Sequence, residues 1–401
     1  MNRPFALFVL LFFCLEACHF KSENKNMTVV PQVVEDSLFS HSDQTISQLV
    51  RRNGKLKNQP VLDKIYTPWH LDSLQFPIVD GQFIQALENN LQLLEYRAQA
   101  KNQQIGDLRV SIEDLRQCIH ILKKWQHTIP MGLASDMEAY QIWGEDRRGN
   151  VRFTAYYTPV IEVDRQPSSN YRYPIYSRPL EWEGPLPSRA EIDGQGVFKG
   201  RGLELAYASN KLDIYFMQLQ GSGFVEYPNG KRELFAYNGS NKYPYRSIES
   251  YMKNRADITL DNFSAASLRK FFRQNPALQD SILFHNPSYT FFSKKKSVPK
   301  GAGNVPLTDF YSLAVDRRYI PLGSCLLADF PIYDQQHKRV IGHEFRLFVA
   351  QDVGGAIKGP GHVDTYIGTG AEAEKIAGRI NYYGRMWLLL PKKDKAVLVS
   401  N

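Results

Sequence analysis

The segment DVGGAIKGPGHVD, residues 352–364, combines residue types that could do chemistry: two aspartates, a histidine and four glycines. Three kinds of site use such residues. Glycine-rich loops bind phosphate through backbone N–H groups, aspartate and histidine ligate metals, and a carboxyl group in a water-poor pocket can donate a proton. The surrounding sequence must distinguish these alternatives.

A phosphate-binding loop is disfavoured. Such a loop runs from a strand directly into a helix and ends in Lys followed by Ser or Thr. Here Lys358 is followed by Gly359 and Pro360, then by the strand-like HVDTYIG, and the next expected helix starts only after Gly370.

A metal site formed by Asp352, His362 and Asp364 is a minor alternative. Metal ligands must converge in threes or fours. His362 and Asp364 are two residues apart, so on a strand they would share one face. The other histidines are scattered, with no second His-x-His pattern or Asp-rich loop. We therefore expect no metal and no cofactor.

An acid site needs one carboxyl group whose pKa is raised by partly apolar surroundings. Asp364 fits because Val363, Tyr366 and Ile367 flank it, and the glycines would let a polymer approach the backbone. The competing explanation is that Asp352 and Asp364 only accept turn hydrogen bonds, as Asp beside Gly commonly does. Taken singly, either aspartate favours that simpler explanation.

The elements that must position this segment change character along the chain. Apolar spacings of three and four predict amphipathic helices at 80–94, capped by Asp80, and at 108–122. From about residue 150, β-rich stretches separated by turns predominate, and a further short helix is expected at 371–379. Examples are 151–163, 171–179, 211–227 and 231–239, with a helix at 265–273. The pattern predicts an α+β, mainly β fold with two barrel-like domains.

Composition is that of an ordinary soluble globular protein, with 43% hydrophobic and 22% charged residues. The net charge of +8 favours polyanionic surroundings such as nucleic acid, anionic lipid or an acidic cell-wall polymer. Basic residues are scattered apart from short runs such as 294–296, without a basic helix, zinc-finger spacing or aromatic RNA-binding pattern. Nucleic acid is therefore not an expected partner.

The N-terminus predicts export. Arg3 is followed by FALFVLLFFCLEAC, an apolar run of signal-peptide length that is too short to span a bilayer. It ends in LEAC, which resembles a bacterial lipobox with Cys18 as the lipid-modified first residue, although Glu16 departs from the pattern. The alternative is a plain secretory signal cut near Ala17, which would leave a soluble periplasmic protein.

Two cysteines, Cys118 and Cys325, remain after the signal and the lipid attachment site are set aside. No disulfide framework or CxxC metal pair is available. We expect both to be small core residues, although an oxidising compartment would permit a bridge if they were close.

Several motifs occur together in a fixed order. SLAVDRRYIPLGS, which contains Asp316, together with VAQDVGGAIKG, HVDTYIG and YYGRMWLL, closely resembles the three-aspartate segment of the membrane-bound lytic murein transglycosylase A family. FTAYYTP, YPIYSRP, SRAEID, QLQGSGFVEY, PYRSI and NPSYTFF also resemble that family, in the same order. The resemblance extends from about 150 to 390, and more loosely over the preceding helices.

The resemblance implies a double-psi β-barrel domain with N-terminal helices and a second, inserted β-barrel domain, with the glycan in a groove between them. The expected division is a signal peptide at 1–17, a lipid anchor and tether at 18–60, the helical part and first barrel strands at 61–158, the inserted barrel at 159–296, and the three-aspartate part of the first barrel at 297–395.

The resemblance also implies a function: cleavage of the β-1,4 bond between N-acetylmuramic acid and N-acetylglucosamine in peptidoglycan, giving 1,6-anhydromuramic ends. Asp364 matches the single catalytic acid and base, and Asp352 and Asp316 match the aspartates that support it. Ala155 replaces a usual glycine, and the loop before Asp364 is one residue longer than typical. The expected glycan contacts are Thr154, Tyr157, Gln220, Gly221, Ser222, Gly223, Gly354 and Lys358.

The expected partners are peptidoglycan strands and cell-wall synthesis or division proteins. A lipid on Cys18 would attach the protein to the outer membrane, with the protein facing the periplasm. Two alternatives stay open. One is a non-catalytic peptidoglycan-binding lipoprotein. The other is a glycoside hydrolase on the same fold, with Asp352 or Asp316 as a second carboxylate.

Overall fold

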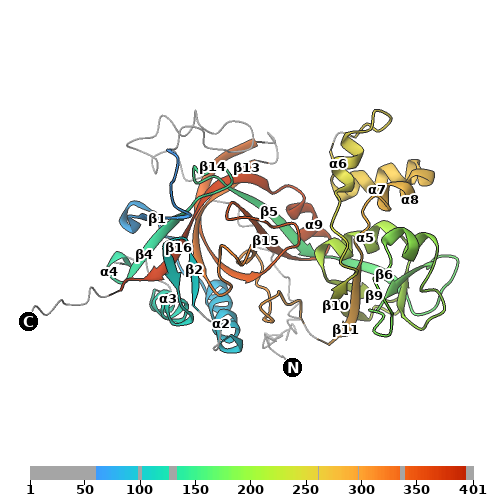
Figure 1. The fold of residues 1–401 in the computed structure, drawn as a ribbon, viewed down its shortest axis with the longest axis horizontal. Coiled ribbons are helices and arrows are strands. Elements are labelled where there is room, and N and C mark those ends of the chain that lie inside the picture. The colour runs from blue at the N-terminus through green and yellow to red at the C-terminus, as the bar shows by residue number, and fades with distance from the viewer. Residues whose placement is uncertain are drawn as a thin grey trace, which may run out of the picture.

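The computed structural model describes residues 60–97, 102–125, 133–260, 262–296, 298–334 and 339–393. The predicted signal peptide, the lipid site at Cys18 and all but the last residue of the predicted tether lie outside these ranges. The described chain forms two lobes, a larger one containing both early and late strands and a smaller one formed by the middle of the sequence (Figure 1).

The larger lobe is built on an eight-stranded sheet of order β1-β4-β16-β13-β14-β12-β15-β5. β5 also pairs with β16, which closes the strands from β16 to β5 into a barrel. The strands are β1 (Tyr66–Trp69), β4 (Met137–Ile142), β5 (Val151–Thr158), β12 (Ser312–Ala314), β13 (Cys325–Asp334), β14 (Arg339–Asp352), β15 (His362–Thr369) and β16 (Asn381–Pro391). The sheet thus joins segments on either side of the smaller lobe in sequence.

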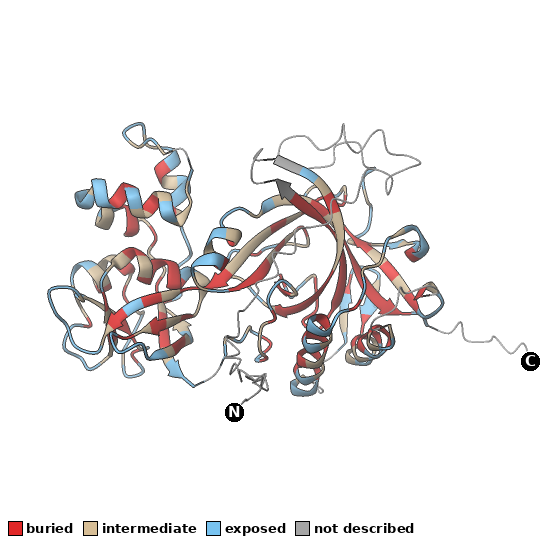
Figure 2. Ribbon diagram, turned by 180° about the vertical axis from the view of Figure 1, so that it is seen from behind, coloured by how far each residue is buried: buried red, intermediate tan, exposed pale blue. Residues whose placement is uncertain are grey.

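Helices α2 (Gly81–Tyr96) and α3 (Ile112–Lys124) pack against one another and cover this sheet, with their buried faces turned toward it (Figure 2). The carboxylate of Asp80 accepts a hydrogen bond from the Phe83 backbone N–H, which confirms the predicted cap of α2. Ser111 and Asp114 form a reciprocal capping box that starts α3. Helix α4 (Leu133–Asp136) and the helical turn η2 (Leu71–Ser73) are short.

The predicted start of the second helix at residue 108 was wrong. Residues Leu108–Val110 form β3, which pairs with β2 (Gln103–Ile105). Gly106, with a φ of 58°, lies in the tight turn between these strands, where a left-handed residue suits a hairpin. The helix therefore begins only after the Ser111 cap.

The smaller lobe has a six-stranded sheet of order β11-β10-β9-β6-β8-β7. Its strands are β6 (Val160–Asp164), β7 (Tyr173–Tyr176), β8 (Glu204–Ala208), β9 (Gly223–Glu226), β10 (Arg232–Ser240) and β11 (Thr290–Lys295). A bridge between Ser177 and Phe292 brings the two edges together. Helices α6 (Ile248–Lys253), α7 (Ala265–Gln274) and α8 (Pro276–Leu283) form a layer with a core of its own. The element η3 (Ala190–Gly194) is a short π-helix. The predicted α+β, mainly β fold with two barrels is confirmed.

The prediction of β structure at 211–220 was wrong, because this segment is helix α5 (Lys211–Gln220). The Asn210 side chain caps its start by accepting from the Leu212 N–H, and Gly221, with a φ of 80°, ends it. Met217 packs into the barrel core, whereas Tyr215 packs into the core of the helical layer. A helix buried on two sides is apolar nearly all round, so its sequence lacks the usual amphipathic spacing.

Helix α9 (Ala371–Ala377) lies where the two lobes meet (Figure 1). Arg269 of α7 donates to Asp213 of α5 at 2.9 Å and to Glu374 of α9 at 2.5 Å, and all three side chains are half-buried. This cluster ties the helical layer and α5 to the larger lobe.

Cys118 and Cys325 are buried in the main core and are not bridged, as expected for small core residues. Among the described helices, none has the length and apolar character required to cross a bilayer.

Candidate active site

The centre of the candidate site is Asp364, in the middle of three paired strands. On one side β15 runs parallel to β5 and places Asp364 beside Thr154. On the other side β15 pairs with β12, which places Asp364 opposite Ala314. The Thr154 hydroxyl donates a hydrogen bond of 2.7 Å to Asp364 Oδ1. Because these strands belong to one barrel, their register fixes the place of the Asp364 backbone.

Asp364 is half-buried, and its pKa is raised from the ordinary 3.8 to about 7. Burial is the main cause, and the nearby negative charge of Asp352 adds to it. The hydrogen bond from Thr154 and the positive charge of Arg152 act in the opposite direction. A carboxyl group with a pKa near neutrality can both donate and accept a proton at that pH.

Asp352, the last residue of β14, is held by three donors. Its Oδ1 accepts from the backbone N–H groups of Ala302 at 2.7 Å and Val353 at 2.8 Å, and its Oδ2 accepts from the Tyr156 hydroxyl at 2.9 Å. Burial raises its pKa, while the two N–H groups and the tyrosine act against that rise. Asp352 thus joins β14, β5 and the segment before β12 around the candidate acid.

Asp316 follows β12 and is bound by Arg318. The guanidinium donates to Oδ1 from Nε at 2.9 Å and to Oδ2 from Nη2 at 2.5 Å, and the Gly359 N–H donates to Oδ2 at 2.9 Å. These hydrogen bonds, that of Arg318 foremost, lower the pKa of Asp316 to about 2. An ionised Asp316 therefore anchors the glycine-rich loop to the end of β12.

Three glycines of that loop have structural requirements of their own. A Cβ on Gly361 would lie 2.0 Å from the Glu145 backbone nitrogen, and one on Gly354 would lie 2.5 Å from Ile357 Cγ1. Gly359 has a φ of 80°, which favours glycine. Close packing at Gly361 and Gly354, and the left-handed backbone at Gly359, account for these glycines without reference to a ligand.

His362 lies on the same face of β15 as Asp364, as the spacing of two predicted. Its Nε2 is 3.0 Å from Thr154 Oγ1, the same oxygen that contacts Asp364. Burial first, and then the charge of Arg152, lower the pKa of His362, while Glu145 raises it. Within the described ranges, no three His, Cys, Asp or Glu side chains are grouped so as to hold a metal ion.

The expected glycan contacts occupy different environments. Thr154 touches Asp364, whereas the Tyr157 ring is buried beneath α9 with Ile367. Gln220 lies at the junction of the lobes, where its Oε1 accepts from the Tyr157 backbone N–H at 3.1 Å. Gly221, Ser222 and Gly223 connect α5 to β9, Gly354 is partly exposed, and Lys358 is exposed.

Tyr156 and Arg318 are the two residues of the site that the sequence analysis missed. Strand alternation gives a usable signal for the first, because residues 154 and 156 share one face of β5 and Tyr157 points to the other. For Arg318 the only signal is its place two residues after Asp316. No pattern distinguishes it from the adjacent Arg317.

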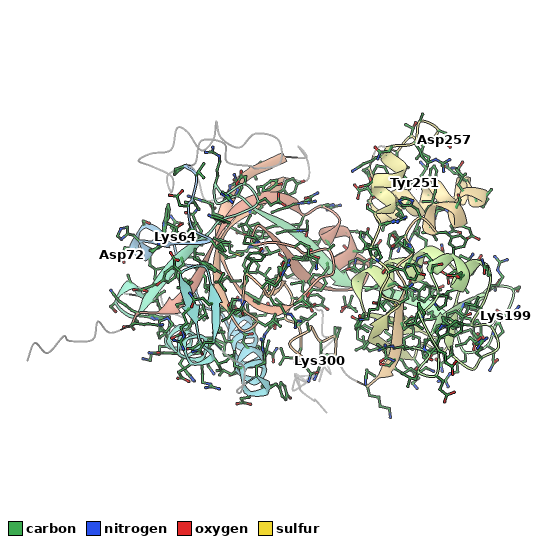
Figure 3. The ribbon with its side chains drawn as sticks, in the orientation of Figure 1. Lys64, Asp72, Lys199, Tyr251, Asp257 and Lys300 are labelled. Carbon is green, nitrogen blue, oxygen red and sulfur yellow. The ribbon has the colours of Figure 1, made fainter. Side chains whose placement is uncertain are left out.

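A cavity of about 670 Å³ lies elsewhere, in the smaller lobe between β7, β8 and η3. Tyr173, Lys199, Tyr207 and Lys211 are among its lining residues. Lys199 is at the outer edge of the smaller lobe, away from the larger barrel (Figure 3). The cavity is therefore separate from the Asp364 site.

Two family descriptions match the chain. Residues 152–293 match the MltA specific insert domain, and residues 311–390 match the 3D domain. Membrane-bound lytic murein transglycosylase A of Escherichia coli K12 is 41% identical over 256 residues, covering 63% of this chain and 69% of the relative. The Vibrio cholerae protein of the same name is 38% identical over 274 residues, covering 67% and 74% respectively.

Solved structures agree with these matches. E. coli MltA with bound chitohexaose superposes with a TM-score of 0.72 at 30% identity, covering 85% of this chain and 98% of that one. A membrane-bound lytic murein transglycosylase from Agrobacterium tumefaciens gives a TM-score of 0.64 at 27% identity, with 77% and 92% covered.

Proposed function

The chain belongs to the membrane-bound lytic murein transglycosylase A family, and from that premise we propose that Asp364 alone serves as the acid and then the base of its reaction. As a murein lytic transglycosylase, it is an enzyme that acts on peptidoglycan. The observation that most directly supports the role of Asp364 is its half-buried carboxyl group, whose pKa is raised to about 7 beside Thr154.

In the proposed mechanism, protonated Asp364 gives its proton to the oxygen that links N-acetylmuramic acid to N-acetylglucosamine. The C1–O bond breaks through an oxocarbenium-like state, which the 2-acetamido group can assist. The Asp364 carboxylate then takes the proton of the muramic C6 hydroxyl, whose oxygen bonds to C1 and closes the 1,6-anhydro ring. No water is consumed, and Asp364 ends protonated for the next cycle.

The surroundings of the other two aspartates favour this mechanism over hydrolysis with a second carboxylate. Both oxygens of Asp352 accept hydrogen bonds, and both oxygens of Asp316 face Arg318 or the Gly359 N–H. A nucleophile or general base needs an uncommitted oxygen that can reach the sugar or a water. We assign Asp352 to raising the pKa of Asp364, and Asp316 to holding the loop.

The glycan would lie along the junction of the lobes, between the inserted part at 159–296 and the parts at 61–158 and 297–395. Thr154, Gln220, Gly221, Ser222, Gly223, Gly354 and Lys358 are the proposed contacts. Tyr157 would then act by shaping this junction from below, since its ring is buried. Attachment to the outer membrane through a lipid on Cys18 belongs to the same proposal.

The test is a digest of purified murein by the wild-type protein and by Asp364→Asn, followed by mass spectrometry. The variant should still bind murein and should release no 1,6-anhydromuropeptides. Asp309→Asn is the matched control, because Asp309 lies beside Gly368 of the same strand and its pKa is also raised by burial. Anhydro products from Asp364→Asn at more than about one-hundredth of the wild-type rate would refute the assignment, since acid–base catalysis contributes about 10²–10⁴-fold.

The same digest separates the two alternative functions. New reducing muramic ends in place of 1,6-anhydro ends would indicate a hydrolase. Binding of murein by the wild-type protein without any soluble fragment would indicate a non-catalytic binding protein.

A further inference from the structure

The Thr154 hydroxyl has one hydrogen and two close polar neighbours. Its oxygen is 2.7 Å from Asp364 Oδ1 and 3.0 Å from His362 Nε2. A third acceptor, the Val363 carbonyl oxygen, lies at 3.4 Å, which is long for a hydrogen bond. Because a hydroxyl donates to one partner at a time, the direction of this hydrogen depends on which neighbour acts as the acceptor.

We propose that His362 is a positioning residue for this hydroxyl. It donates its Nε2–H to Thr154 Oγ1 and so directs the threonine hydrogen to Asp364 Oδ1. The inference rests on the proposed role of Asp364. It assigns a task to a histidine that does not touch the reacting sugar.

The two distances fit this arrangement. The shorter contact has the usual length of an O–H···O hydrogen bond, and the longer one has the usual length of N–H···O. In the opposite arrangement, with Nδ1 protonated and Nε2 bare, the Thr154 hydrogen would turn toward His362. Asp364 Oδ1 would then lose its donor.

The hydrogen bond from Thr154 determines which oxygen of Asp364 carries the proton that is transferred. When Oδ1 accepts from Thr154, the proton of the acid form resides on Oδ2. Among the described residues, Oδ2 receives no hydrogen bond from another group, so its proton is available to a glycosidic oxygen. His362 thereby orients the acid without exchanging a proton with the substrate.

The charged groups around His362 keep the ring neutral near pH 7. Burial and the adjacent Arg152 lower its pKa, and Glu145 opposes them only in part. Glu145 accepts a hydrogen bond from the Tyr383 hydroxyl, and the Arg152 guanidinium donates to Asn381. A neutral ring has two tautomers, and the proposed arrangement uses the one that carries its hydrogen on Nε2.

The experiment compares four variants by the pH dependence of kcat: His362→Leu, His362→Gln, Thr154→Val and the double variant His362→Leu/Thr154→Val. His362→Leu removes the donor that fixes the Thr154 hydroxyl, which can then turn to the Val363 carbonyl oxygen, so kcat should fall by up to about fivefold, the change made by one ordinary hydrogen bond, with KM unchanged. It should also move the alkaline limb to higher pH, because the ionised form of Asp364 loses part of its stabilisation. His362→Gln, whose amide can donate to Thr154, should restore both values.

The double variant separates positioning from a general structural role. If His362 acts through Thr154, adding His362→Leu to Thr154→Val should change neither kcat nor the alkaline limb. A full additional loss in the double variant would overturn the proposal, as would a wild-type profile for His362→Leu alone. A ¹⁵N spectrum of the wild-type protein provides a second readout, and a bare Nε2 at pH 7 would also overturn it.

Failure of this inference is distinguishable from failure of the proposed function. An active Asp364→Asn variant removes the premise. An inactive Asp364→Asn variant, with His362→Leu indistinguishable from wild type, refutes only the role of His362.

Discussion

Replacing Asp364 by asparagine should stabilise the folded protein above pH 7 while abolishing the proposed catalysis. In the folded chain the pKa of Asp364 is raised to about 7, chiefly by burial. In the unfolded chain the same group titrates near its ordinary value of about 4. Ionised Asp364 therefore costs stability that an uncharged amide does not.

Proton linkage gives the sign and the size of the change in the free energy of unfolding. Between about pH 4 and pH 7 the folded state binds one proton more than the unfolded state, so the free energy of unfolding falls as pH rises. The favourable contribution of protonated Asp364 to the free energy of unfolding is complete below pH 4 and lost above pH 7. Each tenfold change in proton affinity corresponds to about 1.4 kcal/mol, which gives about 4 kcal/mol over this window. Water around the half-buried side chain reduces the expected difference to about 2–4 kcal/mol.

The assay is guanidinium unfolding of wild type and Asp364→Asn at pH 4.5 and at pH 8. The variant should be close to wild type at the lower pH and more stable at the higher pH. Asp72→Asn is the control, since Asp72 is exposed in η2 at the far edge of the larger lobe (Figure 3). Equal stability of wild type and Asp364→Asn at both pH values would show that ionisation of Asp364 does not destabilise the folded protein.

Three other variants test the elements around the site. Asp316→Asn should lose about 1–2 kcal/mol at neutral pH, because the lowered pKa of about 2 stabilises the fold above pH 4. The loss should vanish as pH falls from 4 to 2 in unfolding curves, and a pH-independent loss would contradict it. Gly361→Ala should cost about 1–3 kcal/mol in thermal unfolding through overpacking, whereas Gly355→Ala, with no atom within 4 Å of its Cβ, should be nearly neutral. Arg269→Met breaks the link to Glu374 and should speed proteolysis between the lobes; an unchanged cleavage rate would contradict that role.

Local chemistry made some elements of the fold predictable. Asp80 before an apolar stripe predicted the start of α2, and the helix predicted at 265–273 corresponds to α7. Residues 211–220 were wrongly predicted as strand. The number of sides on which an element is buried depends on tertiary packing, which the local sequence does not show. Helix α5 lies between two cores, and its own residues do not record that.

The site was predictable in identity and less so in geometry. The ordered motifs pointed to Asp364, Asp352 and Asp316, whose environments in the structure differ in the sign of their pKa shifts. The contact between Thr154 and Asp364 depends on the register of β5 against β15, strands far apart in the sequence. Such long-range register is set by packing of the whole barrel, so the shared role of Thr154 for Asp364 and His362 emerged only from the structure.

The most direct test of the account is the titration of Asp364 itself. The protein would be prepared with ¹³C-labelled aspartate, and the signal that disappears in Asp364→Asn would be followed from pH 3 to pH 9. A midpoint near 7 is the result predicted for a carboxyl group that serves as both acid and base. A midpoint near 4, the value of an ordinary exposed aspartate, would mean that Asp364 is ionised near pH 7 and cannot serve as the acid there.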